Sequence, residues 1–115
     1  MAIGNNVEAS GDYSHAEGAS TIASGALSHA EGVNTVASGQ YAHAEGEGFS
    51  VNNQTSEYYG AQGYASHAEG GFTIASGKYA HAEGHVSQAY AGASHAEGEY
   101  TIANGYASHA QGYYT

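Results

Sequence analysis

The chain has 115 residues, the length of one domain, and 11 acidic residues stand against a single Lys or Arg, giving a formal net charge of −10 with neutral histidines. This balance argues against nucleic acid and anionic membrane surfaces as partners, because both require many cationic side chains. The absence of cysteine excludes disulfides and thiolate chemistry, and no apolar run is long enough to insert into a membrane.

One pentapeptide recurs along the chain, first as Ser14-His15-Ala16-Glu17-Gly18. The histidines of its seven copies are separated by 14, 14, 24, 14, 14 and 14 residues. A fixed short period of this kind is typical of a solenoid. The outer members of the repeat are His15, Glu17, His29, Glu31, His43, Glu45, His67, Glu69, His81, Glu83, His95, Glu97, His109 and Gln111.

A second pattern, Thr-Ile-Ala-Ser-Gly as in residues 21–25, alternates with the first, so each 14-residue unit consists of two half-coils of seven. Five residues of each half can form a short strand, whose alternation directs Ser, Thr and Ala into the coil. Glycine at nearly every seventh position opposes a helix and suits a turn, because glycine adopts positive φ without steric cost. We therefore predict one all-β solenoid domain over residues 1–115.

The 24-residue step contains ten extra residues, which we assign to an inserted loop at about residues 47–56. Loops that leave a solenoid often carry its function, so Phe49, Val51, Asn52 and Asn53 form a candidate binding loop. The alternative is a tolerated surface insertion that binds nothing.

The predicted interior of Ala, Ser and Thr buries little apolar surface. At about 25 cal/mol per Å² of buried apolar area, such small side chains offset little of the conformational entropy lost on folding. Association of several solenoids side by side would supply the missing burial. We therefore expect a homo-oligomer, with closed symmetry as its default form.

The string Ala-Ser-Gly-x-x-Ser-His-Ala-Glu-Gly, as in residues 23–32, closely resembles the head repeats of trimeric autotransporter adhesins (YadA-like, Hep/Hag) and similar arrays in phage tail fibres and spikes. The resemblance covers Gly4 to Gly112 except the loop. It implies a left-handed parallel β-roll with one 14-residue coil per layer and three chains around an axis, that is, a homotrimer.

The resemblance leaves the orientation of the coil open. In the family, the half-coil that aligns with the Ser-His-Ala-Glu-Gly copies faces the trimer axis and carries Val and Ile, so the alignment sends the His and Glu row to the axis. Hydrophobicity alone would send there instead the row of Ile22, Val36, Ile74 and Ile102. We favour the alignment, with this second row on the outer face.

The chemistry of the His and Glu row has two readings. A hydrogen-bonded His–Glu network without metal is the favoured one, so we assign no metal and no cofactor; a metal-binding solenoid is the alternative, since imidazoles and carboxylates are metal ligands. A pH switch is a further hypothesis: a glutamate beside each histidine would raise the histidine pKa. Ser and His on adjacent strand positions point to opposite faces, so we assign no catalytic residue.

These observations predict a non-enzymatic shaft or head of an extracellular fibre, on a virion tail or a bacterial surface, that attaches to a cell through a glycan or protein. The first six residues lack a basic patch and an apolar core, so we expect no signal peptide in this chain. A pure spacer without a ligand is the alternative. Stacked threonines also suggest ice binding, but strand alternation points Thr21, Thr35, Thr73 and Thr101 into the coil.

Overall fold

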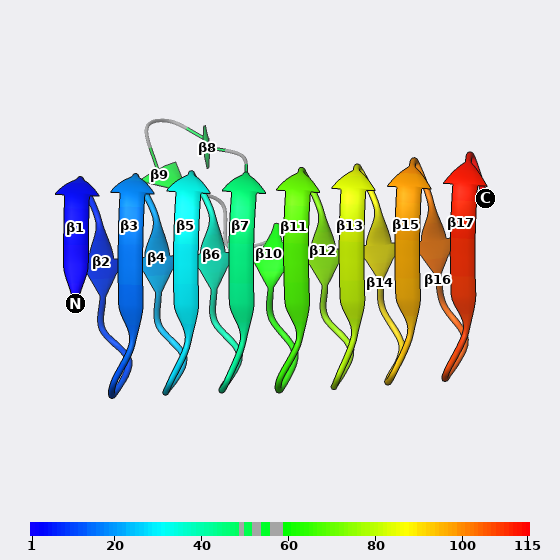
Figure 1. Ribbon diagram of the computed structural model, residues 1–115, viewed down its shortest axis with the longest axis horizontal. Coiled ribbons are helices and arrows are strands. Elements are labelled where there is room, and N and C mark those ends of the chain that lie inside the picture. The colour runs from blue at the N-terminus through cyan, green and yellow to red at the C-terminus, as the bar shows by residue number, and fades with distance from the viewer. Residues whose placement is uncertain (49, 52–53, 56–58) are drawn as a thin grey trace.

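The computed structural model describes residues 1–48, 50–51, 54–55 and 59–115, and it is an all-β solenoid with 14-residue coils (Figure 1). One face is an eight-stranded sheet whose strands lie in the order β1, β3, β5, β7, β11, β13, β15, β17, all paired in parallel. Their bounds are Ala2–Asn5, His15–Ala19, His29–Val33, His43–Glu47, His67–Gly71, His81–His85, His95–Glu99 and His109–Tyr113.

The opposite face is a seven-stranded parallel sheet of two-residue strands, in the order β16, β14, β12, β10, β6, β4, β2. In chain order these are β2 Glu8–Ala9, β4 Ile22–Ala23, β6 Val36–Ala37, β10 Gly60–Ala61, β12 Ile74–Ala75, β14 Gln88–Ala89 and β16 Ile102–Ala103. The two sheets confirm the predicted parallel solenoid and its 14-residue coil. None of the described segments is a helix that could cross a membrane.

The interior is built from small side chains, as the alternation predicts. In the coil that contains β3 and β4, Ala16, Thr21 and Ala23 are fully buried, whereas His15 and Glu17 point outward. The core cluster consists of alanines alone, with Val7, Ala9 and Ala110 packed against it. At these alanine positions the flat coil therefore has no room for a larger side chain between its two sheets.

The inserted segment lies two residues further along the chain than expected. Glu47 at the end of β7 still pairs with Val33, and Gly60 in β10 already pairs with Ile74, so the regular register continues to Gly48 and resumes at Tyr59. The ten extra residues are therefore 49–58. Within them, β8 (Ser50–Val51) and β9 (Gln54–Thr55) pair antiparallel.

The turns differ from the expectation that glycine supplies their positive φ. The residue that bends the chain is the second of the variable pair, with φ of 55° at Leu27, 62° at Tyr79 and 55° at Val86. Gly18 has a positive φ of 118°, but it lies inside β3. A Cβ on Gly18 would lie 2.0 Å from the carbonyl oxygen of Gly32 in the next coil, so close stacking of the coils requires this glycine.

Serine closes the turn before the long strand in several coils, whereas Ala42 and Ala80 take its place in two others. Ser28 is buried, and its hydroxyl donates a 2.7 Å hydrogen bond to the carbonyl of Gly25, three residues earlier. Ser66 and Ser94 donate the same bond to Gly63 and Ala91. The repeated serine is thus a structural residue, and it points away from the neighbouring histidine.

Candidate functional site

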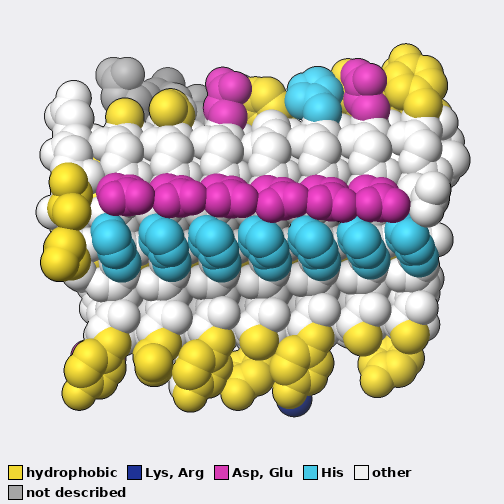
Figure 2. Space-filling view, in the orientation of Figure 1, with side chains coloured by type: hydrophobic (Ala, Val, Ile, Leu, Met, Phe, Trp, Pro, Cys, Tyr) yellow, Lys and Arg dark blue, Asp and Glu magenta, His cyan; other side chains and the backbone are white. Residues whose placement is uncertain are grey.

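The outward residues of the eight-stranded sheet form two straight rows, one of histidines and one of glutamates, which we call the His–Glu ladder (Figure 2). Parallel, in-register pairing sets each histidine on the histidine of the next coil and each glutamate on the next glutamate, as in His67↔His81 and Glu69↔Glu83. The ladder contains His15, Glu17, His29, Glu31, His43, Glu45, His67, Glu69, His81, Glu83, His95, Glu97, His109 and Gln111.

Sequence reasoning missed the start of the ladder. Ile3 of β1 pairs with Glu17 of β3, so an apolar residue, half exposed at 50%, occupies the glutamate row in the first coil. The signal was available, because Ile3-Gly4 precedes Glu17-Gly18 by one 14-residue period.

The imidazole rings stack along the ladder. Ring centroids of successive histidines lie 4.6 to 4.8 Å apart, and from His29 to His109 the planes are within 6° of parallel. The first pair differs, because the rings of His15 and His29 are tilted by 23°. Strand spacing in a sheet is about 4.8 Å, so the parallel register alone produces this stacking.

Each glutamate from Glu45 onward lies between two imidazoles. Glu69 places one carboxylate oxygen 3.5 Å from Nε2 of His67 and the other 3.9 Å from Nε2 of His81. Glu83 does the same for His81 at 3.8 Å and His95 at 3.4 Å. In the described residues the contacts therefore run without interruption from His43 to His109.

These contacts are mostly too long for hydrogen bonds, whose N···O distance is about 2.7–3.2 Å. Only the pair of His109 and Glu97, at 3.2 Å, meets the criterion. Although the histidine side chains are about one third exposed, the Nε2 atoms themselves are buried without a hydrogen-bond partner. They belong to His15, His29, His43, His67, His81 and His95. A single chain thus does not form the hydrogen-bonded network that the sequence favoured.

The pKa shifts run against the pH-switch hypothesis. Burial, and then the charge of neighbouring imidazoles, lower the pKa of His29, His67 and His81, whereas the hypothesis required a raised pKa. The nearby glutamates raise the histidine pKa, but by less than burial lowers it. These imidazoles are therefore neutral at pH 7.

The glutamates share protons along their row. The pKa of Glu69 is raised to about 7, chiefly by its hydrogen bond with Glu83 and then by burial. Glu31 is raised to about 7 in the same way by Glu45. The pKa values of Glu45 and Glu83 are lowered, because each accepts the hydrogen bond of a protonated neighbour. Carboxylates one strand apart cannot all ionise cheaply, so raised and lowered pKa values alternate from Glu31 to Glu83.

The second predicted row lies on the opposite sheet, and it is uneven. Val36 and Ile74 are buried at 0% and 1% exposure, whereas Ile102 is 46% exposed and Ile22 is intermediate. Pairing partners at the same position include Glu8, Gly60 and Gln88, which interrupt the apolar row.

Two other predicted features are the candidate binding loop and the stacked threonines. Phe49, Asn52 and Asn53 of the candidate binding loop lie outside the described residues, and so does the side chain of Val51. The threonines are buried: Thr21, Thr35, Thr73 and Thr101 are 0% to 4% exposed, so they present no flat hydroxyl surface to ice.

The stacked parallel coils and the unbroken ladder define a β-solenoid repeat protein whose outer rows repeat once per coil. The family model of the YadA head domain repeat matches residues 16–42, 30–48 and 96–115, and over these segments it confirms the resemblance seen in the sequence. No curated protein matches the chain.

Proposed function

We propose that this chain is a non-enzymatic adhesive module of an extracellular fibre, either the head of a bacterial surface adhesin or the shaft of a phage tail fibre. In this proposal three copies associate around an axis, with the His–Glu ladder facing inward. The YadA head repeats support the adhesin class, and the regular stack of thin coils suits a rigid element that holds a binding surface away from its anchor.

The observation that carries the proposal is the set of buried, unpartnered Nε2 atoms along the ladder. A buried polar atom without a partner costs about 1–3 kcal/mol, so a face with six of them is stabilised by a surface that offers partners. Side chains of a second and third copy offer the same carboxylates and imidazoles at the same spacing. The opposite row supports no such contact, because it is interrupted by Glu8, Gly60 and Gln88.

Paired substitutions test which face associates. His81→Arg places a long cation in the centre of the ladder, and Ile102→Arg places the same side chain on the opposite sheet, where Ile102 is 46% exposed. We expect His81→Arg to give monomers and Ile102→Arg to leave the mass of the wild-type assembly unchanged, as measured by light scattering after gel filtration. The reverse result would place the second row at the axis.

Attachment is tested by deleting residues 49–58. The deletion joins Gly48 to Tyr59 and converts the 24-residue step into a regular 14-residue step, so the solenoid is preserved. We expect the full chain to bind a cell surface or immobilised glycans, and the deletion to lose that binding while keeping its circular dichroism spectrum. Absence of binding by the full chain would leave only the spacer function and contradict the adhesive one.

A further inference from the structure

We infer that the His–Glu ladder binds divalent transition-metal ions, each held by two histidines of adjacent coils and the glutamate between them. Each set draws its ligand atoms from one chain, so the binding does not depend on the proposed assembly.

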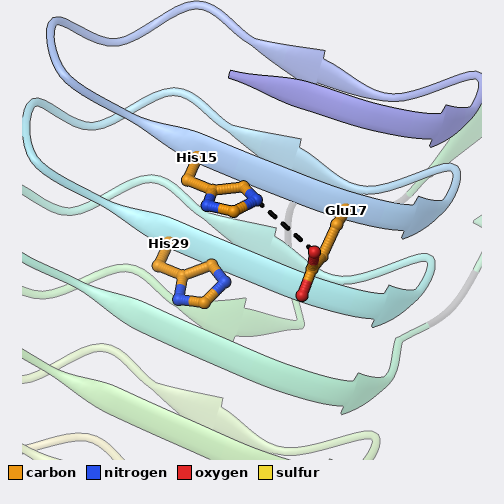
Figure 3. A group of neighbouring side chains, drawn as sticks. All are labelled: His15, Glu17 and His29. Carbon is orange, nitrogen blue, oxygen red and sulfur yellow. Dashed lines mark ion pairs between the residues drawn. The ribbon is translucent and has the colours of Figure 1, made fainter.

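The ladder brings the right atoms together repeatedly. In four sets, two histidine nitrogens and one carboxylate oxygen all lie within 4.8 Å of one another. The sets are His15-Glu17-His29, His67-Glu69-His81, His81-Glu83-His95 and His95-Glu97-His109. A fifth cluster, Glu31-His43-Glu45, has a single histidine. Figure 3 shows the first set, in which the Glu17 carboxylate pairs with His15 and His29 lies on the next strand.

The distances between the ligand atoms of a set suit a small metal ion after a modest shift of the side chains. Zn²⁺ holds imidazole nitrogen and carboxylate oxygen at about 2.0–2.2 Å, which puts the ligand atoms of a tetrahedral site about 3.4 Å apart. The Glu69 oxygens lie 3.5 Å and 3.9 Å from the two histidine nitrogens of their set. The two nitrogens must approach each other by about 1 Å and the rings must tilt to share an ion. The tilt of 23° between His15 and His29 shows that the stack admits such a rotation.

The unpartnered nitrogens give the independent observation. Six ladder Nε2 atoms are buried and accept or donate no hydrogen bond, yet each lies within reach of a carboxylate. A metal ion would satisfy two of them at once through their lone pairs. Imidazole with carboxylate is a ligand set that suits Zn²⁺, Ni²⁺, Co²⁺ and Cu²⁺, whereas Ca²⁺ and Mg²⁺ prefer oxygen ligands alone.

The overlap of the sets predicts a stoichiometry. His81 and His95 each belong to two sets, so at most three of the four His-Glu-His sets can hold an ion at once, namely those of Glu17, Glu69 and Glu97. Replacing His81 removes a ligand from the set of Glu69 and from the set of Glu83. Two sets, those of Glu17 and Glu97, then remain. This predicted step from three ions to two distinguishes the ladder from scattered surface binding.

The test uses the full chain stripped of metal, titrated with Zn²⁺ by calorimetry and with Co²⁺ by its visible ligand-field absorption. We expect up to three ions per wild-type chain, and one fewer in His81→Asn and in Glu69→Gln. Bound Co²⁺ should show the visible absorption that imidazole ligands give. His85→Asn is the matched control, because His85 lies outside the ladder, exposed beside Glu99. Its stoichiometry should equal that of the wild type.

The proposal is overturned if the wild type binds neither ion, or if His85→Asn lowers the stoichiometry as much as His81→Asn does. Should His81→Asn fail to fold by circular dichroism, Glu69→Gln decides the question alone. Solution mass measured with and without Zn²⁺ separates ions held within a chain from ions that merely cross-link chains. A protein that assembles but binds neither ion would contradict the metal site and leave the proposed assembly standing.

Discussion

The imidazole rings of His67 and His81 stack with their centroids 4.8 Å apart and their planes 4° from parallel. The spacing is that of neighbouring strands, so the backbone ladder of the solenoid fixes the geometry of its outer face. The same relation places each glutamate from Glu45 to Glu97 beside two imidazoles and glycines such as Gly84 against the next coil.

Coil stacking makes an internal glycine irreplaceable. A Cβ on Gly84 would lie 2.1 Å from the carbonyl oxygen of Gly98, whereas a Cβ on Gly112, with φ of 117° against 107° at Gly84, would meet only Thr115 at 3.6 Å. We expect Gly112→Ala to cost about 1–2 kcal/mol through its backbone conformation, and Gly84→Ala to cost clearly more, because the next coil must move. Urea unfolding measures both. Equal costs would mean that stacking imposes no constraint.

The left-handed turn residues carry strain that asparagine relieves. Val86 has φ of 55°, a conformation unfavourable for a β-branched side chain, while Asn34 occupies the equivalent turn position at 56°. We expect Val86→Asn to stabilise the chain by about 0.5–1 kcal/mol and Asn34→Val to destabilise it by a similar amount. Thermal melting of the two variants checks the signs. A loss of stability in Val86→Asn would contradict the assignment of strain.

The narrow interior tolerates no added volume. Ala30 is fully buried between the sheets, whereas Ala19 lies at a position that Val33 occupies in the next coil. We therefore expect Ala30→Val to cost about 1–3 kcal/mol and Ala19→Val to be nearly neutral. Both residues lie at strand positions, so the comparison isolates the direction of the side chain. Similar unfolding midpoints for the two variants would refute the close packing of the interior.

Proton sharing among the glutamates predicts that the metal-free protein loses stability as the pH rises. Glu69 has its pKa raised from 4.5 to about 7, so the folded chain retains a proton that the unfolded chain releases. The stability that this group contributes is therefore lost as the pH rises from 4.5 to 7. Its facing groups are Glu45, Glu83, His67 and His81.

Glu69→Gln imitates the protonated form. At pH 8 we expect it to stabilise the metal-free chain by about 1 kcal/mol, a value discounted for the exposure of the row. The gain should shrink as the pH falls towards 4.5. Melting temperatures of both proteins across this range, in the presence of a chelator, provide the measurement. A gain that is independent of pH would show that Glu69 does not share its proton.

Much of the fold could be predicted from the sequence, because one sequence repeat corresponds to one coil of the solenoid. The steps between His15 and its copies fix the layer spacing, and strand alternation fixes which residues point inward. The turns were less predictable. Nothing about Tyr79 or Val86 signals a positive φ, since the register of the stacked coils imposes it from outside the residue. The loop bounds required the pairing of Glu47 and Gly60 on either side.

The ladder was predictable in composition but not in chemistry. The sequence places His67 beside Glu69, and a neighbouring carboxylate ordinarily raises an imidazole pKa. The structure stacks His67 between His43 and His81 and buries its Nε2, so burial and like charges outweigh the carboxylate. Only a fold in which distant repeats become neighbours reveals these competing contacts.

The central claim is that thin coils with an unsatisfied outer ladder are completed by further copies of the same chain. Sedimentation equilibrium of the wild-type protein at neutral pH tests it most directly, because one chain has a mass of 11.7 kDa. The account predicts a single species of three times that mass over a wide concentration range. A folded species of 11.7 kDa that persists at high concentration would contradict it.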